Sequence, residues 1–362
     1  MHIIQKVVLL FITSALTQNI CGFAENKVKE LYTTKGRTEI TSDKSIVLIS
    51  AASSVTFGFK GSKCTLNFKS ADHHGYVVLE VDGKYYAREK VQPTGTSVFV
   101  TVGGDKHTIT AYKATEATTG NITFTGAEGD LYKVKNEPKK KIEFIGDSIT
   151  SGMGNDSKEI PCGSGEWYDQ HNGYYSYASI AARAVDADFI LNSVSGISMY
   201  RNWNDEHDKE AIMPDVYGNL YLNKDTSKPY NFDFGADITC IALGTNDFSD
   251  GDGVKPRLPF NEDTYISNYL NFIAVIYKHN PDTHIVLLNS PMVTGPKAAI
   301  FIKCLNRIKD TVNTTKAHKP VTVFTFNAVT PHGCGYHPEI EDDKRMASQL
   351  APYLKTILNE KK

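Results

Sequence analysis

The first part of the chain alternates between apolar and polar residues with a period of two. The alternating runs lie at about residues 45–50, 55–60, 64–69, 76–81, 84–87, 97–102 and 107–112. This period puts alternate side chains on opposite faces of a strand, so each run predicts a short β-strand. We expect Gly61-Ser62 to join two of these strands, and Asp82-Gly83 to form the tight turn of a hairpin. Many short strands at regular spacing predict an all-β sandwich or jelly roll over residues 25–135.

The pattern changes after a charged stretch at 135–141 that includes Pro138, and we interpret this stretch as a domain boundary. Continuous apolar runs follow at 142–146, 189–194, 238–243, 284–289 and 321–327, and helical patterns lie at about 173–186, 263–279, 297–314 and 343–359. Strands without polar alternation, separated by helices, are typical of a parallel sheet covered on both faces. Residues 142–362 are therefore predicted to form a three-layer α/β domain.

Length and composition fit this two-part organisation. A chain of 362 residues is longer than a typical single domain, and a hydrophobic content of 41% is enough for a sizeable core. The formal net charge of -2 argues against a nucleic-acid-binding protein, which normally carries a basic patch. The composition leaves the oligomeric state open.

The first 24 residues are predicted to be a secretory signal peptide. Lys6 precedes the apolar run 7–16, and the small residues Gly22 and Ala24 offer a cleavage site. The run is too short to span a bilayer, and no other stretch is apolar enough to do so. We therefore predict a secreted, extracellular protein without a membrane span.

Secretion would permit disulfide bonds. Five cysteines follow residue 24, so at least one is expected to be free or bonded to another chain. Cys240 lies in an apolar strand and is expected to be a buried small side chain. Cys162 and Cys334 lie in glycine-rich loops that could meet, although the sequence leaves the pairing open.

Four segments with chemical potential adjoin the predicted α/β elements. Ser148 follows the first parallel strand, Gly196 the second and Asn246 the third, and His337 precedes the last helix. The carboxyl ends of parallel strands meet at one edge of the sheet, so we expect these residues to converge. Histidine is a base poised near neutral pH that can activate a serine hydroxyl. We predict Ser148 and His337 as catalytic residues. The backbone N–H groups of Ser148 and Gly196 and the Asn246 amide are predicted to form an oxyanion hole.

These four blocks resemble those of the SGNH (GDSL-type) hydrolase superfamily over residues 142–360. The resemblance implies a flavodoxin-like parallel sheet and a serine hydrolase that forms an acyl-enzyme, with no metal or organic cofactor. A narrower resemblance, to carbohydrate esterase family 2, rests on the β-rich module and on residues 113–116, 174–177, 195–203 and 213–215. It implies a jelly-roll module ahead of the hydrolase domain and removal of O-acetyl groups from xylan- or glucomannan-type polysaccharides or oligosaccharides.

One position departs from the superfamily pattern, because Cys334 stands where an aspartate usually precedes the histidine by three residues. The resemblance to the esterase family implies a Ser–His dyad in which a backbone carbonyl orients the His337 ring. The other titratable residues near this segment are His332, Glu339, Asp342 and Asp343. We expect the acidic residues to serve the first turn of the following helix, and the second histidine to be a weaker candidate for the base. Asp147 and Asp247 are expected to hydrogen-bond their own loops.

Aromatic residues near the predicted site could offer flat faces to sugar rings. The candidates for substrate binding are Trp167, Tyr200 and Trp203. Two other functions stay open: a GDSL-type lipase or lysophospholipase with a long apolar acyl channel, and a non-catalytic carbohydrate-binding protein with an idle hydrolase site. We favour a β-rich module that forms one wall of the cleft over a module that binds polysaccharide by itself.

Overall fold

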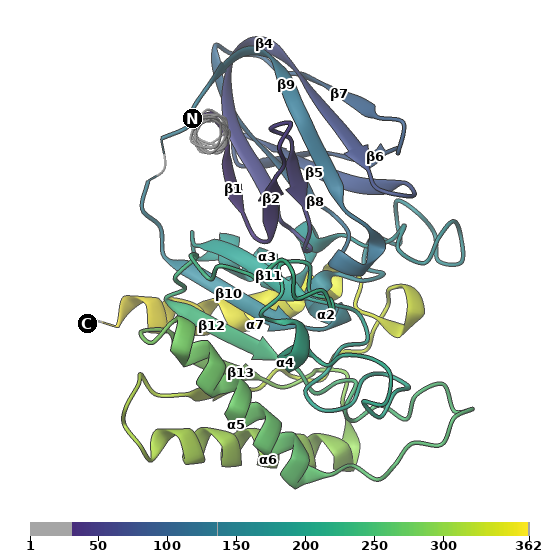
Figure 1. Ribbon diagram of the computed structural model, residues 1–362, viewed down its shortest axis with the longest axis vertical. Helices are drawn as coiled ribbons and strands as arrows, with labels where there is room; N and C mark the ends of the chain where they lie inside the picture. Colours follow the sequence, from purple (N-terminus) through teal and green to yellow (C-terminus); the bar gives the residue numbers. More distant parts are fainter. Residues whose placement is uncertain (1–30, 136, 361–362) are drawn as a thin grey trace, which may run out of the picture.

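The computed structural model describes residues 31–135 and 137–360 (Figure 1). The predicted signal peptide at 1–24 lies outside the described residues. Within the described ranges, no helix has the length and apolar character that a bilayer span requires. The chain forms an antiparallel sheet up to residue 132 and a parallel sheet from residue 141 onward, and these two parts lie one above the other in Figure 1.

The first part is built from antiparallel strands, as the alternating pattern predicts. Its strands are β1 (Thr33–Lys35), β2 (Thr38–Ile40), β3 (Ile46–Leu48), β4 (Ser54–Ser70), β5 (Gly75–Val81), β6 (Lys84–Val91), β7 (Thr96–Thr101), β8 (Lys106–Lys113) and β9 (Ile122–Tyr132). They pair in the order β2-β3-β9-β4-β8-β5-β6, while β1 and β7 each pair with β4. Alternate residues such as Val55, Phe57 and Phe59 are buried in a shared core. The antiparallel architecture is confirmed, and the jelly-roll connectivity stays a prediction.

The two turns predicted in this part have different outcomes. Asp82 and Gly83 connect β5 to β6 with φ values of 52° and 75°, and two consecutive positive φ angles are what a tight hairpin turn requires. The expectation that Gly61-Ser62 joins two separate strands is wrong, because β4 runs through these residues as one strand of 17 residues. Gly61, at a φ of 81°, bends the strand without reversing it. The first half of β4 therefore pairs with β8 and the second half with β7.

The second part contains the predicted parallel sheet. Its strands are β10 (Lys141–Gly146), β11 (Asp188–Ser193), β12 (Ile238–Ala242), β13 (His284–Leu288) and β14 (Thr322–Phe324). Neighbouring strands all run parallel, in the order β11-β10-β12-β13-β14. The strand order therefore reverses at β10, and open α/β sheets bind ligands at the carboxyl ends of the strands beside such a reversal.

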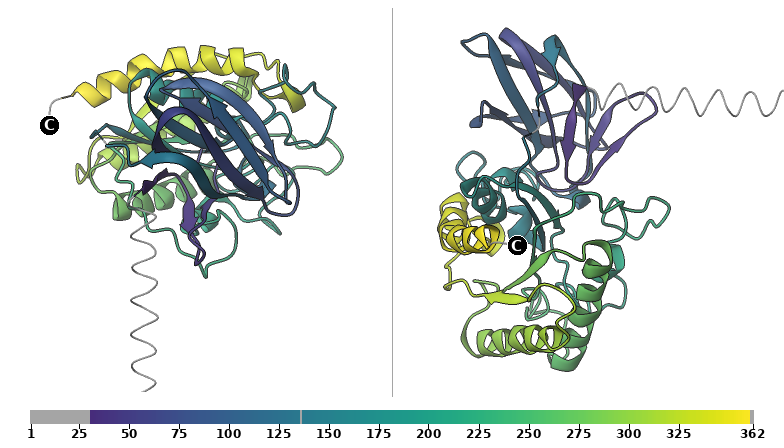
Figure 2. Two further views of the ribbon diagram at one scale, coloured as in Figure 1. Left: turned by 90° about the horizontal axis from the view of Figure 1, so that it is seen from above. Right: turned by 90° about the vertical axis from the view of Figure 1, so that its left-hand side faces the viewer.

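Helices cover both faces of the parallel sheet, which confirms the three-layer prediction. They are α2 (Ser148–Ser151), α3 (Tyr177–Ala184), α4 (Met213–Val216), α5 (Glu262–His279), α6 (Gly295–Asn313) and α7 (Ile340–Asn359), with the short 3-10 helices η1 (Ala117–Thr119), η2 (Gly173–Tyr175) and η3 (Cys334–Tyr336). Helices α5 and α6 share one buried core with Ile145 and Leu287, and α3 and α7 share the other with Phe144 and Val286. Figure 2 shows α7 and α5 on opposite sides of the sheet.

Buried polar contacts join the two parts. Arg37 is fully buried, and its guanidinium donates to Asn192 Oδ1 and to the Tyr217 carbonyl, each at 2.7 Å. The backbone of Gly173 also donates to the carbonyl of Ala114 across the boundary, at 2.8 Å. A buried guanidinium is costly unless its N–H donors are paired. Separating the two parts would break the hydrogen bonds that Arg37 makes to Asn192 and Tyr217. The antiparallel part is thereby fixed against the α/β part.

Candidate active site

Ser148 is placed by the sharp turn from β10 into the short helix α2. Gly146 ends the strand, and a Cβ at that position would lie 2.1 Å from Thr150 Oγ1, so only glycine fits the turn. Asp147 caps the helix because its Oδ1 accepts from the Ile149 N–H at 3.0 Å, which confirms its predicted structural role. Burial raises the pKa of Asp147 to about 6. Ser148 follows as the first helical residue, with its hydroxyl at the carboxyl edge of the sheet.

His337 contacts the serine, as predicted. Its Nε2 lies 2.7 Å from Ser148 Oγ, and its Nδ1 lies 2.7 Å from the carbonyl oxygen of Gly335. A carbonyl can only accept, so Nδ1 carries the hydrogen and Nε2 is left free to accept the serine proton. Gly335 has a φ of 62°, a conformation that glycine adopts without strain, and this turn directs its carbonyl back to the imidazole.

The protonation state of His337 suits a base. Burial lowers the pKa of the imidazole below its usual value, and the contacts with the backbone at Gly335 and Cys334 oppose this effect only in part. The neutral form is therefore favoured near neutral pH. A neutral imidazole with a free Nε2 can accept a proton from the hydroxyl that it contacts.

The predicted oxyanion donors face the same cavity as Ser148 and His337. Within the described residues, the backbone N–H groups of Ser148 and Gly196 have no protein acceptor. The Asn246 amide gives one hydrogen to the Ile197 carbonyl at 2.9 Å, which orients it and leaves its second hydrogen free. All three residues line one cavity of about 850 Å³ together with His337. Unpaired donors around a serine hydroxyl are the arrangement that stabilises a developing oxyanion.

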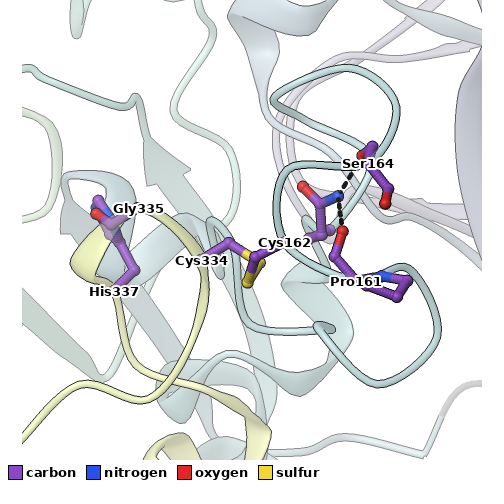
Figure 3. The surroundings of a disulfide bond; sticks show 7 residues. Pro161, Cys162, Ser164, Cys334, Gly335 and His337 are labelled. Carbon is purple, nitrogen blue, oxygen red and sulfur yellow. Dashed lines mark hydrogen bonds between the residues drawn. A yellow bond between two sulfur atoms is a disulfide. The ribbon is translucent and has the colours of Figure 1, made fainter.

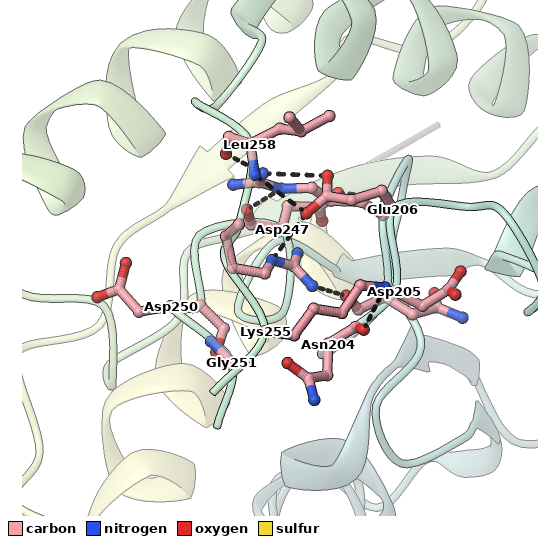
Figure 4. A network of polar contacts seen from close by, with 12 residues as sticks. Asn204, Asp205, Glu206, Asp247, Asp250, Gly251, Lys255 and Leu258 are labelled. Atoms are coloured by element: carbon pink, nitrogen blue, oxygen red, sulfur yellow. Dashed lines mark hydrogen bonds and ion pairs between the residues drawn. The ribbon is translucent and has the colours of Figure 1, made fainter. Parts of the chain in front are cut away.

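Asp247 connects the loop that contains Gly196 to the loop that contains Asn246. Its buried carboxylate accepts from the backbone N–H groups of residues 199–201, which follow Gly196, while its own backbone follows Asn246. The Arg201 side chain donates back to the Asp247 carbonyl at 2.8 Å, and Glu206 forms ion pairs with Arg201 and Arg257 (Figure 4). Asp247 therefore has a structural role, but the expectation that it bonds its own loop is wrong, because its carboxylate accepts from residues 198–201 of the neighbouring loop. The network fixes the spacing between the Gly196 and Asn246 donors.

A disulfide bond anchors the histidine loop. Cys334 bonds to Cys162, which answers the pairing that the sequence leaves open, and Figure 3 shows this bond beside Gly335 and His337. The three other cysteines in the described residues, Cys64, Cys240 and Cys304, are free and buried. The residue that replaces the usual aspartate therefore holds the backbone next to the carbonyl acceptor, and contributes no charge to the imidazole.

The acidic residues near the histidine contact other groups. Asp342 accepts from the Glu339 N–H at 3.0 Å, which caps helix α7, and its carboxylate also contacts His332 Nδ1 at 3.0 Å. Asp343 differs from the expectation, because it accepts from the Tyr177 N–H of another helix instead of from its own first turn. None of these side chains has a hydrogen bond to His337 among the contacts of the described residues.

One group of side chains in the described residues could hold a metal ion. It consists of His332, Glu339 and Asp342, whose ligand atoms lie within 4.8 Å of one another. The Asp342 carboxylate already contacts His332, the Arg345 guanidinium and the Glu339 N–H. These contacts explain the cluster as helix capping and charge pairing, and none of its members lines the cavity that contains Ser148.

The structure separates the three aromatic candidates for substrate binding. Trp203 lines the cavity and is 47% exposed. Trp167 is also exposed, but it packs on Tyr168 and does not line the cavity. Tyr200 lies outside the lining as well, because its ring packs against the aromatic side chains beside helix α5 and its hydroxyl accepts from the backbone of residue 261. Tyr336, which no sequence pattern pointed to, also lines the cavity, is 88% exposed and directly precedes the predicted base.

None of the described residues of the β-rich module forms the expected wall of the cleft. Every residue that lines the cavity lies at position 148 or later, so the module does not shape the described part of this cleft. Among the described residues, the α/β part supplies both sides of the cavity, with Trp203 on the loop that contains Gly196 and Tyr336 on the loop that contains His337. The preference for a wall is therefore wrong for this cavity.

Both parts of the chain match known protein families. Residues 34–138 match the family described as Carbohydrate esterase 2 N-terminal. Residues 144–351, more than half of the chain, match the GDSL-like Lipase/Acylhydrolase family. The second match includes Ser148, Gly196, Asn246 and His337.

A curated relative and two solved structures are similar over most of the chain. The acetylxylan esterase / glucomannan deacetylase of Cellvibrio japonicus (strain Ueda107) is 30% identical over 315 residues, which cover 82% of this chain and 81% of the relative. A family two carbohydrate esterase from Clostridium thermocellum, in complex with cellohexaose, is 25% identical with a TM-score of 0.78 and covers 90% of this chain and 99% of its own. A carbohydrate esterase family 2 enzyme plus carbohydrate binding domain from Corynascus thermopiles (Myceliophthora fergusii) is 27% identical with a TM-score of 0.76, at 90% and 99% coverage.

Proposed function

Because the chain belongs to the GDSL-like lipase/acylhydrolase family, and within it to carbohydrate esterase family 2, we propose that it is a serine esterase that removes O-acetyl groups from carbohydrate. The contact of 2.7 Å between His337 Nε2 and Ser148 Oγ, in a cavity with three unpaired N–H donors, carries this proposal. We infer polysaccharides or oligosaccharides of xylan or glucomannan type as substrates, because the curated relative is named for these activities.

The proposed reaction has two halves. Ser148 Oγ attacks the acetyl carbonyl carbon while His337 Nε2 takes the hydroxyl proton, and the carbonyl oxygen becomes an oxyanion held by the N–H groups of Ser148, Gly196 and Asn246. The imidazolium then returns its proton to the leaving sugar oxygen, which departs as an alcohol and leaves acetyl-Ser148. Water attacks this ester while His337 takes its proton, and acetate leaves with the serine hydroxyl restored. The carbonyl of Gly335 holds the imidazole in the required tautomer throughout.

The cavity lining favours carbohydrate over a lipid chain. The lining combines apolar side chains, among them Met153 and Phe248, with the charged side chains of Asp250, Asp252 and Lys297. A sugar offers apolar ring faces and hydroxyl groups to such a mixture, whereas a long acyl chain would have to desolvate the charged groups without compensation. This chemistry argues against the lipase or lysophospholipase alternative.

Secretion is part of the proposal. The apolar segment at 7–16 has the length and flanking residues of a signal peptide. The disulfide between Cys162 and Cys334 adds an independent argument, because such bonds persist mainly in oxidising compartments outside the cytosol. An extracellular location would also give the enzyme access to polymeric substrates.

Acetate release from acetylated xylan, acetylated glucomannan and p-nitrophenyl acetate, measured for the wild-type protein and Ser148→Ala, tests the function. The wild-type protein is expected to release acetate from all three substrates and the variant from none. Equal rates for the two proteins would exclude the serine mechanism. A comparison of p-nitrophenyl acetate with p-nitrophenyl laurate tests the lipase alternative, which predicts a preference for the longer chain.

A further inference from the structure

The oxyanion segment receives a carboxylate from the antiparallel part of the chain. Glu116 lies between β8 and η1, and its side chain is fully buried. Its Oε2 accepts from the Ser195 backbone N–H at 2.7 Å and from the Ser195 hydroxyl at 2.6 Å. Ser195 directly precedes Gly196, whose N–H is one of the proposed oxyanion donors. Glu116, from the antiparallel part of the chain, therefore makes two hydrogen bonds to Ser195, the neighbour of the proposed donor Gly196.

Glu116 is itself held firmly. Its second carboxylate oxygen accepts from the Thr118 hydroxyl, and its backbone carbonyl accepts from Lys113 Nζ at 2.5 Å and from Thr119 Oγ1 at 2.8 Å. Lys113 is also fully buried, and burial lowers its pKa to about 7, an effect that the nearby Glu116 opposes in part. The three hydroxyl and amide donors to the Glu116 carboxylate hold this side chain in a fixed orientation.

The contacts of Glu116 fix the Gly196 segment on the side that its other contacts leave open. Gly196 has a φ of 77°, a conformation that few other residues would hold, and its N–H has no acceptor within the described residues. On its far side the segment is fixed by Trp203, whose N–H donates to the Gly196 carbonyl at 2.9 Å, and by the Asp247 network. On the N-terminal side of Gly196, Ser195 makes two charge-assisted hydrogen bonds to Glu116. These bonds set the orientation of the Ser195–Gly196 peptide group.

We propose that Glu116 is a positioning residue for the oxyanion hole. The antiparallel part of the chain thereby supports the active site through Ser195 without lining its cavity. The inference rests on the proposed function. It explains how this part can serve catalysis although every residue of the cleft lining belongs to the α/β part. Glu116 does not touch the substrate, and it acts through Ser195 on the Gly196 N–H.

Glu116→Ala should lower kcat much more than it changes KM. A donor displaced by about 1 Å can cost about 100-fold in rate, so we expect kcat on p-nitrophenyl acetate to fall by about that factor while KM changes less than about threefold. Glu116→Gln keeps one acceptor oxygen for Ser195, and we expect a smaller fall of about tenfold. The rate at which a p-nitrophenyl phosphonate modifies Ser148 should fall in parallel, because this reaction also develops charge on the oxygen in the oxyanion hole.

Glu80→Ala is the matched control. Glu80 also bonds across the boundary between the two parts, accepting from the Tyr174 hydroxyl at 2.8 Å, but neither residue lines the cavity. We expect this variant to keep its kcat, even if its thermal unfolding temperature falls as far as that of Glu116→Ala. If Glu116→Ala does not fold, Glu116→Gln and Ser195→Ala take its place, because each removes only part of the contact.

Four outcomes are possible, and each decides the inference. A selective loss of kcat in the Glu116 variants, absent from Glu80→Ala, would support it. Equal kcat in the Glu116 and Glu80 variants, while Ser148→Ala is inactive, would overturn it and leave the esterase function standing. A loss of the Glu116 variants' activity through KM alone would also overturn it, since misplaced oxyanion donors act on the transition state. Wild-type activity equal to that of Ser148→Ala would instead remove the proposed function, and the positioning role with it.

Discussion

The imidazole Nδ1 of His337 lies 2.7 Å from the carbonyl oxygen of Gly335, a residue two positions earlier in the same loop. In many serine hydrolases a carboxylate holds this nitrogen, fixes the tautomer and stabilises the imidazolium. A carbonyl dipole can fix the tautomer fully, but it stabilises the imidazolium only in part. The charge that would raise the basicity of the ring is therefore missing, and two predictions follow from this difference.

The first prediction concerns the neighbouring carboxylates. Asp342→Asn should keep kcat within about threefold of wild type, because Asp342 contacts His332 and the start of α7 and has no bond to His337. Ser148→Ala and His337→Ala should each lose at least about 1000-fold. Steady-state hydrolysis of p-nitrophenyl acetate measures all three. A loss in Asp342→Asn as large as that in Ser148→Ala would show that the site depends on a carboxylate after all.

The second prediction concerns pH. The pKa of His337 is lowered, so the protonated, inactive form accumulates only below the usual histidine value of about 6.5. We expect kcat/KM to be constant near neutral pH and to fall only as the pH drops below about 6.5. The unfolded chain binds this proton more readily than the folded one, so the contribution of His337 to stability also falls as pH drops through this window. Circular dichroism over the same pH range distinguishes protonation of His337 from unfolding of the protein. An acid limb at or above pH 6.5 would contradict the dyad.

The third prediction concerns the disulfide. The double variant Cys162→Ser/Cys334→Ser should lower the free energy of unfolding by about 2–5 kcal/mol, because the bond closes a long loop in the unfolded chain. It should also lower kcat, since Cys334 holds the backbone beside Gly335. Denaturant unfolding and kinetics with and without dithiothreitol measure these effects. The reductant should impair the wild-type protein and leave the double variant unchanged, and impairment of both equally would point to another target.

The α/β part could be predicted closely because its signals are local. Continuous apolar runs and helical periodicity gave strands and helices that lie within a few residues of the observed ones, and strand ends placed Ser148, Gly196 and Asn246 at one edge. The error at Gly61 has a physical reason, since a glycine with positive φ serves a bend and a hairpin equally well. Which of the two forms depends on the partners of each half of the strand, and these lie far away in sequence.

The contacts that fix the site were harder to predict for the same reason. The bonds of Glu116 to Ser195 and of Cys162 to Cys334 join residues 79 and 172 positions apart, and no local pattern encodes such distances. The aromatic residues illustrate a related difficulty. Trp203 and Tyr200 stand three residues apart in one loop, yet one lines the cavity and the other packs beside α5, because the turn of the loop decides which side each faces.

The fourth prediction separates the oxyanion donors from substrate binding. Asn246→Ala removes a side-chain donor that the Ile197 carbonyl orients toward the cavity. We expect kcat to fall by about 100- to 1000-fold, the usual result of losing one such donor, with a small change in KM. Steady-state kinetics on p-nitrophenyl acetate are sufficient for the measurement. Asn268→Ala is the matched control, because this amide also orders a loop backbone, through the Met199 carbonyl, and does not line the cavity. Equal losses in both variants would assign the effect to loop stability.

The fifth prediction concerns Trp203, the one aromatic candidate that reaches the cavity. An indole face gains apolar contact from a sugar ring but offers nothing to a bare acetyl group, so its loss should act on carbohydrate substrates alone. For Trp203→Ala we expect KM on an acetylated xylo- or gluco-oligosaccharide to rise by about tenfold, an effect of the size expected for one lost stacking contact, while kinetics on p-nitrophenyl acetate stay near wild type.

Trp203→Phe keeps an aromatic face and should recover most of the affinity. Trp167→Ala is the control, since this equally exposed tryptophan lies outside the cavity lining. A rise in KM for the small ester as well would mean that Trp203 supports the neighbouring Gly196 segment instead of the sugar.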